Sequence, residues 1–167
     1  MKFKRPKILK NFQECFHDKR GFLNPISFKD LFDDKNFNPL YQLMSYTKSK
    51  NTFRGFHFQK PPSQQRKMLL VHSGEILDIV FPYDDPKKNS VEIFDLQAGD
   101  MLMIPNNFAH GFYTKSSGVL LQYFLDQEFS PKDYTGLNGE NYISELVSRD
   151  DIIISENDKN LPEINFD

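Results

Sequence analysis

The stretch MLLVHSGEILDIVF, residues 68–81, contains two apolar runs on either side of a glycine. Apolar residues fill its first half as far as His72, and they return from Ile76 to Phe81. Between the two runs, Ser73-Gly74-Glu75 carries a turn signal, because glycine adopts backbone conformations that other residues avoid. We therefore predict two short strands, rich in apolar side chains, on either side of a tight turn.

Further short strands are expected on both sides of this stretch, beginning near Tyr41. Residues 91–96 alternate between apolar and polar, as a half-buried strand does. Three more apolar runs follow at 101–105, 109–114 and 118–125, with glycine or proline turns between them. Short strands spaced about ten residues apart are typical of a sandwich or closed jelly roll. We predict an all-β jelly roll with short helices near its ends.

The length of 167 residues indicates a single domain. We expect residues 1–50 to hold N-terminal strands and a short helix with Ser27 as its N-cap. Residues 51–130 are expected to form the core, and 131–167 a tail with a short helix near 143–147. The only cysteine, Cys15, permits no internal disulfide, which favours a reducing compartment and a cytoplasmic protein.

Composition argues against two classes of partner. The 21 basic and 23 acidic residues are well mixed, whereas nucleic-acid binding normally needs a basic face. The chain also lacks an apolar run of about eighteen residues, the length that spans a bilayer. Its 17 Phe and 7 Tyr are unusually many, and some of these rings could stack on a ring-bearing ligand.

Two segments place a histidine inside an aromatic run. These are FRGFHFQ at 53–59, with His57, and IPNNFAHGF at 104–112, with His110. A buried imidazole is costly unless it has a partner or a task. Because the chain has only four histidines, the two segments suggest one pocket lined from both sides. Cys15 beside His17 leaves a Cys–His nucleophile as a much less favoured interpretation.

Gly99, Pro105 and His110 have the spacing of the second conserved motif of the cupin superfamily, which this part of the chain resembles. Metal-binding cupins carry an H-x-H pair in their first motif, where this chain has His57-Phe58-Gln59. The resemblance therefore implies a site without metal. His72 and Glu75 keep a metal-dependent cupin oxygenase open as an alternative.

A longer resemblance covers four segments in order: 54–59, 65–67, 74–78 and 104–112. Together they resemble the dTDP-4-dehydrorhamnose 3,5-epimerase family, metal-free cupins that act on nucleotide-linked 4-keto sugars. The resemblance implies a cofactor-independent epimerase that inverts C3, C5 or both of such a sugar, for surface-polysaccharide biosynthesis.

The resemblance also implies three catalytic residues. His57 matches the family's base, since an imidazole can accept a proton near neutral pH. Lys67 matches the lysine beside the keto oxygen, where a fixed cation stabilises an enolate. Asp158, in the segment Ser155–Lys159, matches the carboxylate that orients the imidazole.

The diphosphate is expected to meet Arg20 and Arg54, whose forked side chains suit phosphate oxygens. Arg20 and Phe22 lie in the N-terminal segment that, in the family's homodimers, reaches the partner's site. His110 matches a pocket histidine that supports the sugar. The remaining predicted substrate contacts are Gln42, Gln59, Tyr123, Phe129 and Tyr134.

Some positions depart from the family's pattern. The resemblance places a tyrosine acid just before Ser130-Pro131, where this chain has Phe129. Because a phenyl ring cannot donate a proton, Tyr123, Tyr134 or a water would have to replace it. A polar sugar contact is also lost at Met44. These departures keep open an altered epimerisation, a 3,4-ketoisomerase or a non-catalytic sugar-nucleotide-binding cupin.

Overall fold

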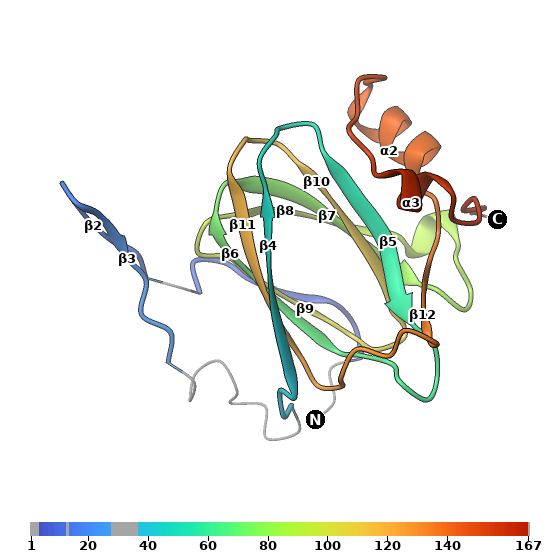
Figure 1. Ribbon diagram of the computed structural model, residues 1–167, viewed down its shortest axis with the longest axis horizontal. Helices are drawn as coiled ribbons and strands as arrows, with labels where there is room; N and C mark the ends of the chain where they lie inside the picture. Colours follow the sequence, from blue (N-terminus) through green and yellow to red (C-terminus); the bar gives the residue numbers. More distant parts are fainter. Residues whose placement is uncertain (1–3, 13, 28–36, 167) are drawn as a thin grey trace.

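The computed structural model describes residues 4–12, 14–27 and 37–166. Two five-stranded antiparallel sheets face each other and form a jelly-roll sandwich (Figure 1). The first sheet runs in the order β1 (Lys7–Leu9), β9 (Met101–Ile104), β6 (Lys67–Ser73), β11 (Val119–Leu125) and β4 (Tyr41–Thr47). The second runs in the order β12 (Tyr134–Gly136), β5 (Phe53–Gln59), β10 (Phe108–Thr114), β7 (Glu75–Pro82) and β8 (Glu92–Gln97). The predicted all-β cupin jelly roll is confirmed.

The two strands of the stretch 68–81 form as predicted, but they do not pair with each other. β6 lies in the first sheet and β7 in the second, so the chain crosses from one sheet to the other at Gly74. Gly74 has a φ of +84°, and a Cβ there would lie 2.7 Å from the side chain of Val119. Both strands are mostly buried, and each pairs with the neighbouring strands of its own sheet.

The core between the sheets consists of aliphatic and aromatic side chains such as Leu69, Ile76 and Leu121. A second apolar cluster lies on the other face of the β12–β8 sheet, where Phe56 and Phe81 pack against Ile143. Ile143 belongs to helix α2 (Glu140–Val147), which confirms the predicted C-terminal helix. The tail beyond α2 packs on the same sheet and ends near the short helix α3 (Glu156–Lys159) (Figure 1).

The N-terminal part splits into two portions. β1 joins the first sheet beside β9, whereas the hairpin of β2 (Phe16–Asp18) and β3 (Gly21–Leu23) stands away from the sandwich (Figure 1). The helix predicted from Ser27 to Phe32 falls on residues outside the described ranges, apart from Ser27 itself. A single 3₁₀ turn, η1 (Lys88–Ser90), precedes β8.

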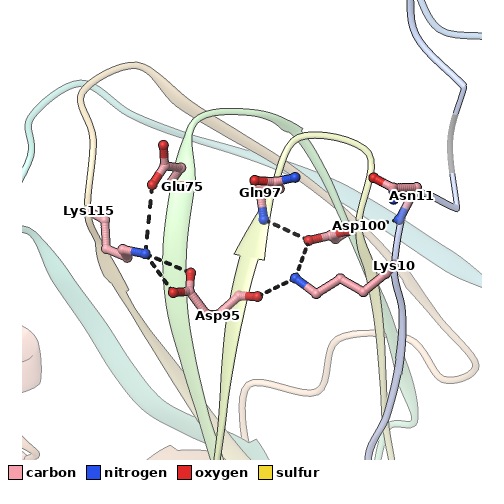
Figure 2. Close-up of polar contacts among 7 residues, drawn as sticks. All are labelled: Lys10, Asn11, Glu75, Asp95, Gln97, Asp100 and Lys115. Carbon is pink, nitrogen blue, oxygen red and sulfur yellow. Dashed lines mark hydrogen bonds and ion pairs between the residues drawn. The ribbon is translucent and has the colours of Figure 1, made fainter.

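A buried carboxylate fixes the turn between β8 and β9. Asp100 is fully buried, and its Oδ1 accepts a hydrogen bond from the backbone N–H of Asn11 at 2.9 Å. Its Oδ2 accepts from the backbone N–H of Gln97 at 2.9 Å and from Lys10 Nζ at 2.8 Å. Figure 2 shows Lys10 reaching Asp100 and the backbone oxygen of Asp95 together. This network ties the end of β1 to the sandwich.

No helix within the described ranges combines the length and the apolar character needed to cross a membrane.

Candidate active site

A cavity of about 700 Å³ opens between the two sheets and is closed on one side by the C-terminal tail. This volume falls in the range of small-molecule sites. Eight of the predicted residues line it: Arg54, His57, Lys67, His110, Tyr123, Phe129, Tyr134 and Asp158. Another hollow, of about 670 Å³, is lined by residues such as Lys4, Arg66 and Asp126, and contains none of the predicted site residues.

His57 and Asp158 form a hydrogen-bonded pair at the cavity wall. His57 Nε2 lies 2.8 Å from Asp158 Oδ1, although the two residues are about a hundred positions apart in the chain. Burial alone raises the pKa of Asp158, but hydrogen bonds from His57, Gly55 N–H and Ser155 outweigh it and leave that pKa below its usual value. Asp158 is therefore a charged partner that fixes the imidazole through Nε2.

Local structure explains how the pair meets. Ser155 caps α3 by accepting a hydrogen bond from the N–H of Asp158 at 3.1 Å, which holds the carboxylate at the first turn. On the other side, Gly55 and Gly111 let β5 and β10 come unusually close. A Cβ on Gly55 would lie 2.5 Å from the Cα of Gly111, where the pairing of the two strands is irregular.

Lys67 enters the cavity from β6, on the opposite sheet. Its Nζ donates a hydrogen bond to the backbone oxygen of His57 at 3.2 Å, so the base and the cation are neighbours. Burial lowers the pKa of Lys67 to about 8, while the charge of Asp78 acts in the opposite direction. The side chain therefore remains an ammonium at neutral pH.

His110 pairs with His57 across strands β10 and β5, and both rings face the cavity. Its Nδ1 lies 3.4 Å from Asp78 Oδ2. Burial lowers the pKa of His110 well below its usual value, and the charges of Lys67 and His57 add to this effect. His110 is therefore neutral and can contact a ligand only as a hydrogen-bonding group.

The three aromatic residues predicted at the site differ in how deeply they are buried. Tyr123, on β11, is buried and lies with its ring 5.7 Å from that of His110. Phe129 is 47% exposed and packs edge-on against Tyr134 at 5.3 Å between ring centres. Phe129, at the position where the resemblance places the family's acid, therefore lines the cavity with a half-exposed ring. Of the tyrosines that line the cavity, Tyr123 is the buried one.

Tyr134, on β12, lies next to the base. Its ring centre is 5.6 Å from that of His57, and both residues belong to the same sheet. Burial raises the pKa of Tyr134 to about 12, and the charge of Asp158 adds to the rise. Burial also raises the pKa of Tyr123 well above its usual value. Both hydroxyls therefore stay protonated at neutral pH.

Four predicted residues do not line the cavity. Gln59 is buried, and its amide donates to the backbone oxygen of Ser63 at 2.6 Å and accepts from the N–H of Ser130 at 2.8 Å. Its predicted substrate contact is therefore replaced by a brace on the segment that carries Phe129. Gln42 is absent from the lining, whereas its neighbours Tyr41 and Leu43 belong to it.

The other two, Arg20 and Phe22, lie on the projecting β2–β3 hairpin (Figure 1). The Arg20 side chain is 84% exposed and forms an ion pair with Asp18 on the same hairpin. Whether this hairpin reaches a partner's cavity stays a prediction.

One buried group beside the site received no role from the sequence. Asp78 is fully buried in β7, and its Oδ2 lies 3.4 Å from His110 Nδ1. The signal that could have found it is a carboxylate inside the apolar run ILDIVF, which buries a charge unless a partner is near. Among the described residues, no group of three or more His, Cys, Asp or Glu side chains is arranged to hold a metal ion.

Comparisons with known proteins agree with this geometry. Residues 6–165 match the family described as dTDP-4-dehydrorhamnose 3,5-epimerase. The chain is 28% identical over 162 residues to the enzyme of that name from Methanothermobacter thermautotrophicus, covering 88% of this chain and 84% of the relative. It is 31% identical over 138 residues to the one from Salmonella typhimurium, covering 75% and 72%.

Solved structures of the same name share the fold. A dTDP-4-dehydrorhamnose 3,5-epimerase from Bacillus anthracis, with TDP and PPi bound, superposes with a TM-score of 0.77 and 27% identity, covering 95% of this chain and 94% of that one. Another, from Sulfolobus tokodaii, gives a TM-score of 0.69 and 30% identity, covering 92% and 90%.

Proposed function

Because the chain belongs to the dTDP-4-dehydrorhamnose 3,5-epimerase family, we propose that it inverts C3, C5 or both of a nucleotide-linked 4-keto-6-deoxy sugar without a cofactor. The observation that carries the proposal is the meeting of His57, Asp158 and Lys67 in one cavity, from segments far apart in the chain. A hydrogen beside a ketone is weakly acidic, so its removal needs both a base and a cation at the oxygen.

His57 is the proposed base. Asp158 accepts the hydrogen bond from one ring nitrogen, which leaves the lone pair of the other nitrogen available for the proton at C3 or C5. When the imidazole takes up that proton it becomes a cation, and the adjacent carboxylate stabilises it. The His57–Asp158 pair therefore lowers the energy of the protonated intermediate.

Lys67 is the proposed partner of the keto oxygen. As the proton leaves, negative charge moves onto the oxygen at C4, and a fixed ammonium stabilises that charge more strongly in a water-poor cavity than in water. The hydrogen bond from Lys67 Nζ to the backbone of His57 holds the cation beside the base. Abstraction and charge stabilisation thus occur at neighbouring positions.

Inversion also requires a proton donor on the other face of the sugar, and Tyr123 is the proposed donor. His57 comes from β5 and Tyr123 from β11, which belong to opposite sheets and therefore to opposite walls of the cavity. Tyr134 shares the sheet of His57 and lies against its ring, so it approaches from the same wall. The loss of tyrosine at Phe129 leaves this donor in place.

The nucleotide is proposed to lie at the mouth of the cavity. Arg54 is an exposed member of the lining, where its guanidinium can meet a diphosphate, and Phe129 offers an apolar ring at the rim for a base. The TDP bound in the Bacillus anthracis relative supports a thymidine nucleotide.

We also propose a homodimer in which the β2–β3 hairpin carries Arg20 and Phe22 to the partner's cavity. The hairpin exposes Phe16, Phe22 and Leu23, and the edge strand β4 exposes Met44 and Tyr46. Apolar side chains gathered on a projecting element favour an interface. The lone Cys15 fits a reducing compartment, and we propose that the protein acts in the cytoplasm.

Incubation in deuterium oxide with a dTDP-linked 4-keto-6-deoxy sugar tests the function. We expect deuterium at C3, C5 or both by product NMR, and a rate greatly reduced in His57→Asn. Movement of the carbonyl to C3 would instead identify a 3,4-ketoisomerase. Tight binding without exchange would identify a non-catalytic binding protein.

A further inference from the structure

We propose that Gln59 is a positioning residue that fixes the ring of Phe129 against the cavity, and that the fixed ring sets how tightly a nucleotide is held there. The second half of this inference rests on the proposed place of the nucleotide at the mouth of the cavity. Gln59 itself is absent from the cavity lining, whereas Phe129 belongs to it. Gln59 therefore acts on the ligand through Phe129.

The side chain of Gln59 bonds both peptide groups that flank Phe129. Its Nε2 donates a hydrogen bond to the backbone oxygen of Glu128 at 3.2 Å. Its Oε1 accepts a hydrogen bond from the backbone N–H of Ser130 at 2.8 Å. Because one amide holds the backbone on each side of Phe129, it determines where the ring of Phe129 points.

The amide of Gln59 is committed to this role. Only 2% of the residue is exposed, and its Nε2 also donates to the backbone oxygen of Ser63 at 2.6 Å. An amide nitrogen has two N–H bonds, and both are used by backbone oxygens. Gln59 could bind a sugar only by leaving one of these buried backbone groups unpaired, which is costly.

The segment that carries Phe129 depends on such side-chain bonds. Residues 126–130 belong to no strand or helix, so no sheet ladder fixes them. Gln65 adds a second hold, since its Nε2 donates to the backbone oxygens of Gln127 at 3.0 Å and of Glu128 at 3.2 Å. The two glutamines thus replace the regular backbone pairing that the segment lacks.

The position of Phe129 matters for the wall of the cavity. Its ring packs against Tyr134, with 5.3 Å between ring centres, and the ring of Tyr134 lies 5.6 Å from that of His57. Phe129 is the outermost of the three, at the rim. We therefore expect its displacement to weaken the binding of a nucleotide more than it slows proton transfer at His57.

A fluorescent reporter tests the positioning. The chain contains no tryptophan, so Phe129→Trp places a single indole at this position. In that background we compare Gln59→Met with Gln64→Met, two changes that remove an amide and nearly keep its length. Gln64 lies in the loop after β5, and its amide bonds the hydroxyl of Tyr83. It is a matched control because it does not contact residues 127–130 through that bond.

Two readouts follow the two halves of the inference. Quenching of the indole by acrylamide reports how exposed the ring at position 129 is, and it needs no activity. With Phe129 in its natural form, calorimetry gives the Kd of TDP, and deuterium exchange gives KM and kcat for the sugar nucleotide.

We expect Gln59→Met to increase the quenching and to weaken TDP binding by about tenfold, the lower end of what stacking on an aromatic ring contributes. KM should rise by a similar factor with little change in kcat, because His57 and Lys67 stay in place. Gln64→Met should leave all of these values unchanged. If Gln59→Met does not fold, Gln59→Glu keeps an acceptor for Ser130, loses the amide donors and is judged in the same way.

Unchanged quenching in the Gln59 variant, or an equal increase in both variants, overturns the inference. A displaced ring with unchanged TDP affinity overturns its second half, as does a parent protein that does not bind TDP. Absence of deuterium exchange in the parent protein would instead refute the proposed epimerisation, and the fluorescence result would still decide whether Gln59 positions Phe129.

Discussion

The sandwich buries two aspartates completely, Asp78 beside the cavity and Asp100 at the turn between β8 and β9. Both oxygens of Asp100 accept hydrogen bonds, from two backbone N–H groups and from Lys10. Asp78 has one long contact to His110 and an oxygen without a partner among the described residues. Asp78 belongs to β7, and Asp100 lies in the turn that follows its neighbouring strand β8.

The difference separates structure from chemistry. The hydrogen bonds from the backbone and from Lys10 compensate the charge of Asp100, so we assign this residue a role in stability alone. Asp78 instead contacts His110, and His110 lines the cavity. Substitutions of residues that line the cavity should therefore alter the reaction more than the stability. Substitutions in the hydrogen-bond network of Asp100 should alter the stability more than the reaction.

The largest expected effect is that of His57→Asn at the cavity. General acid–base catalysis contributes about 10²–10⁴-fold, and we expect deuterium exchange into the sugar to fall by about that factor. The melting temperature should stay close to that of the wild type, because His57 is only partly buried. A His57→Asn variant that loses stability together with activity would contradict the separation of catalytic residues at the cavity from stabilising residues around Asp100.

The second effect distinguishes the two tyrosines. Tyr123→Phe should lower the inversion rate by about 10²-fold, because it removes the donor opposite the base. Tyr134→Phe keeps the ring beside His57 and removes only a hydroxyl on the same wall, so we expect a smaller loss. Exchange and inversion measured together on both variants check this. A larger loss in Tyr134→Phe would assign the donor to the wall of His57.

The third effect is a dependence on pH that runs in opposite directions for activity and stability. The pKa of Lys67 is lowered to about 8 from an ordinary 10.5. As pH rises through about 8, Lys67 loses its proton and kcat/KM should fall by about tenfold per unit. Between the folded and unfolded pKa values the unfolded chain binds more protons, so the contribution of Lys67 to the free energy of unfolding increases with pH. Lys67→Arg, which stays charged, should lack this alkaline limb in whatever activity it retains.

The smallest expected effect on the reaction is that of Asp100→Asn. Loss of a charged acceptor from a buried network costs about 1–3 kcal/mol, and we expect the free energy of unfolding in urea to fall by that amount. The exchange rate of the folded protein should be unchanged. A large loss of kcat at full stability would show that the β8–β9 turn also controls the cavity.

Much of the fold follows from local pattern. The alternation in 91–96 and the apolar runs at 101–105, 109–114 and 118–125 each mark a strand that the structure contains. The pairing of those strands does not follow in the same way, as β6 and β7 show by entering different sheets. Periodicity predicts which face of a strand is buried, but it does not predict which strands lie on either side of it.

The residues of the candidate site also fall into those that the sequence predicts and those that only the structure places. His57, Lys67 and Asp158 can be selected from the sequence, because each lies in a segment that resembles a motif of the family. Gln59 could not be placed from motifs, since its amide bonds the backbone of residues 63 and 130 and does not line the cavity. Phe129 lines the cavity as predicted, but the motifs did not show that its ring is 47% exposed.

The strands and the family follow from the order of residues along the chain, since each depends on nearby residues. The packing of the two sheets and the tail brings His57 and Asp158 to 2.8 Å from each other and places Tyr123 on the opposite sheet. The same packing sets Asp78 against His110 and Asp100 at the turn between β8 and β9. The physical reason is that charge and hydrogen bonding depend on distance and burial, which the packing of the two sheets sets.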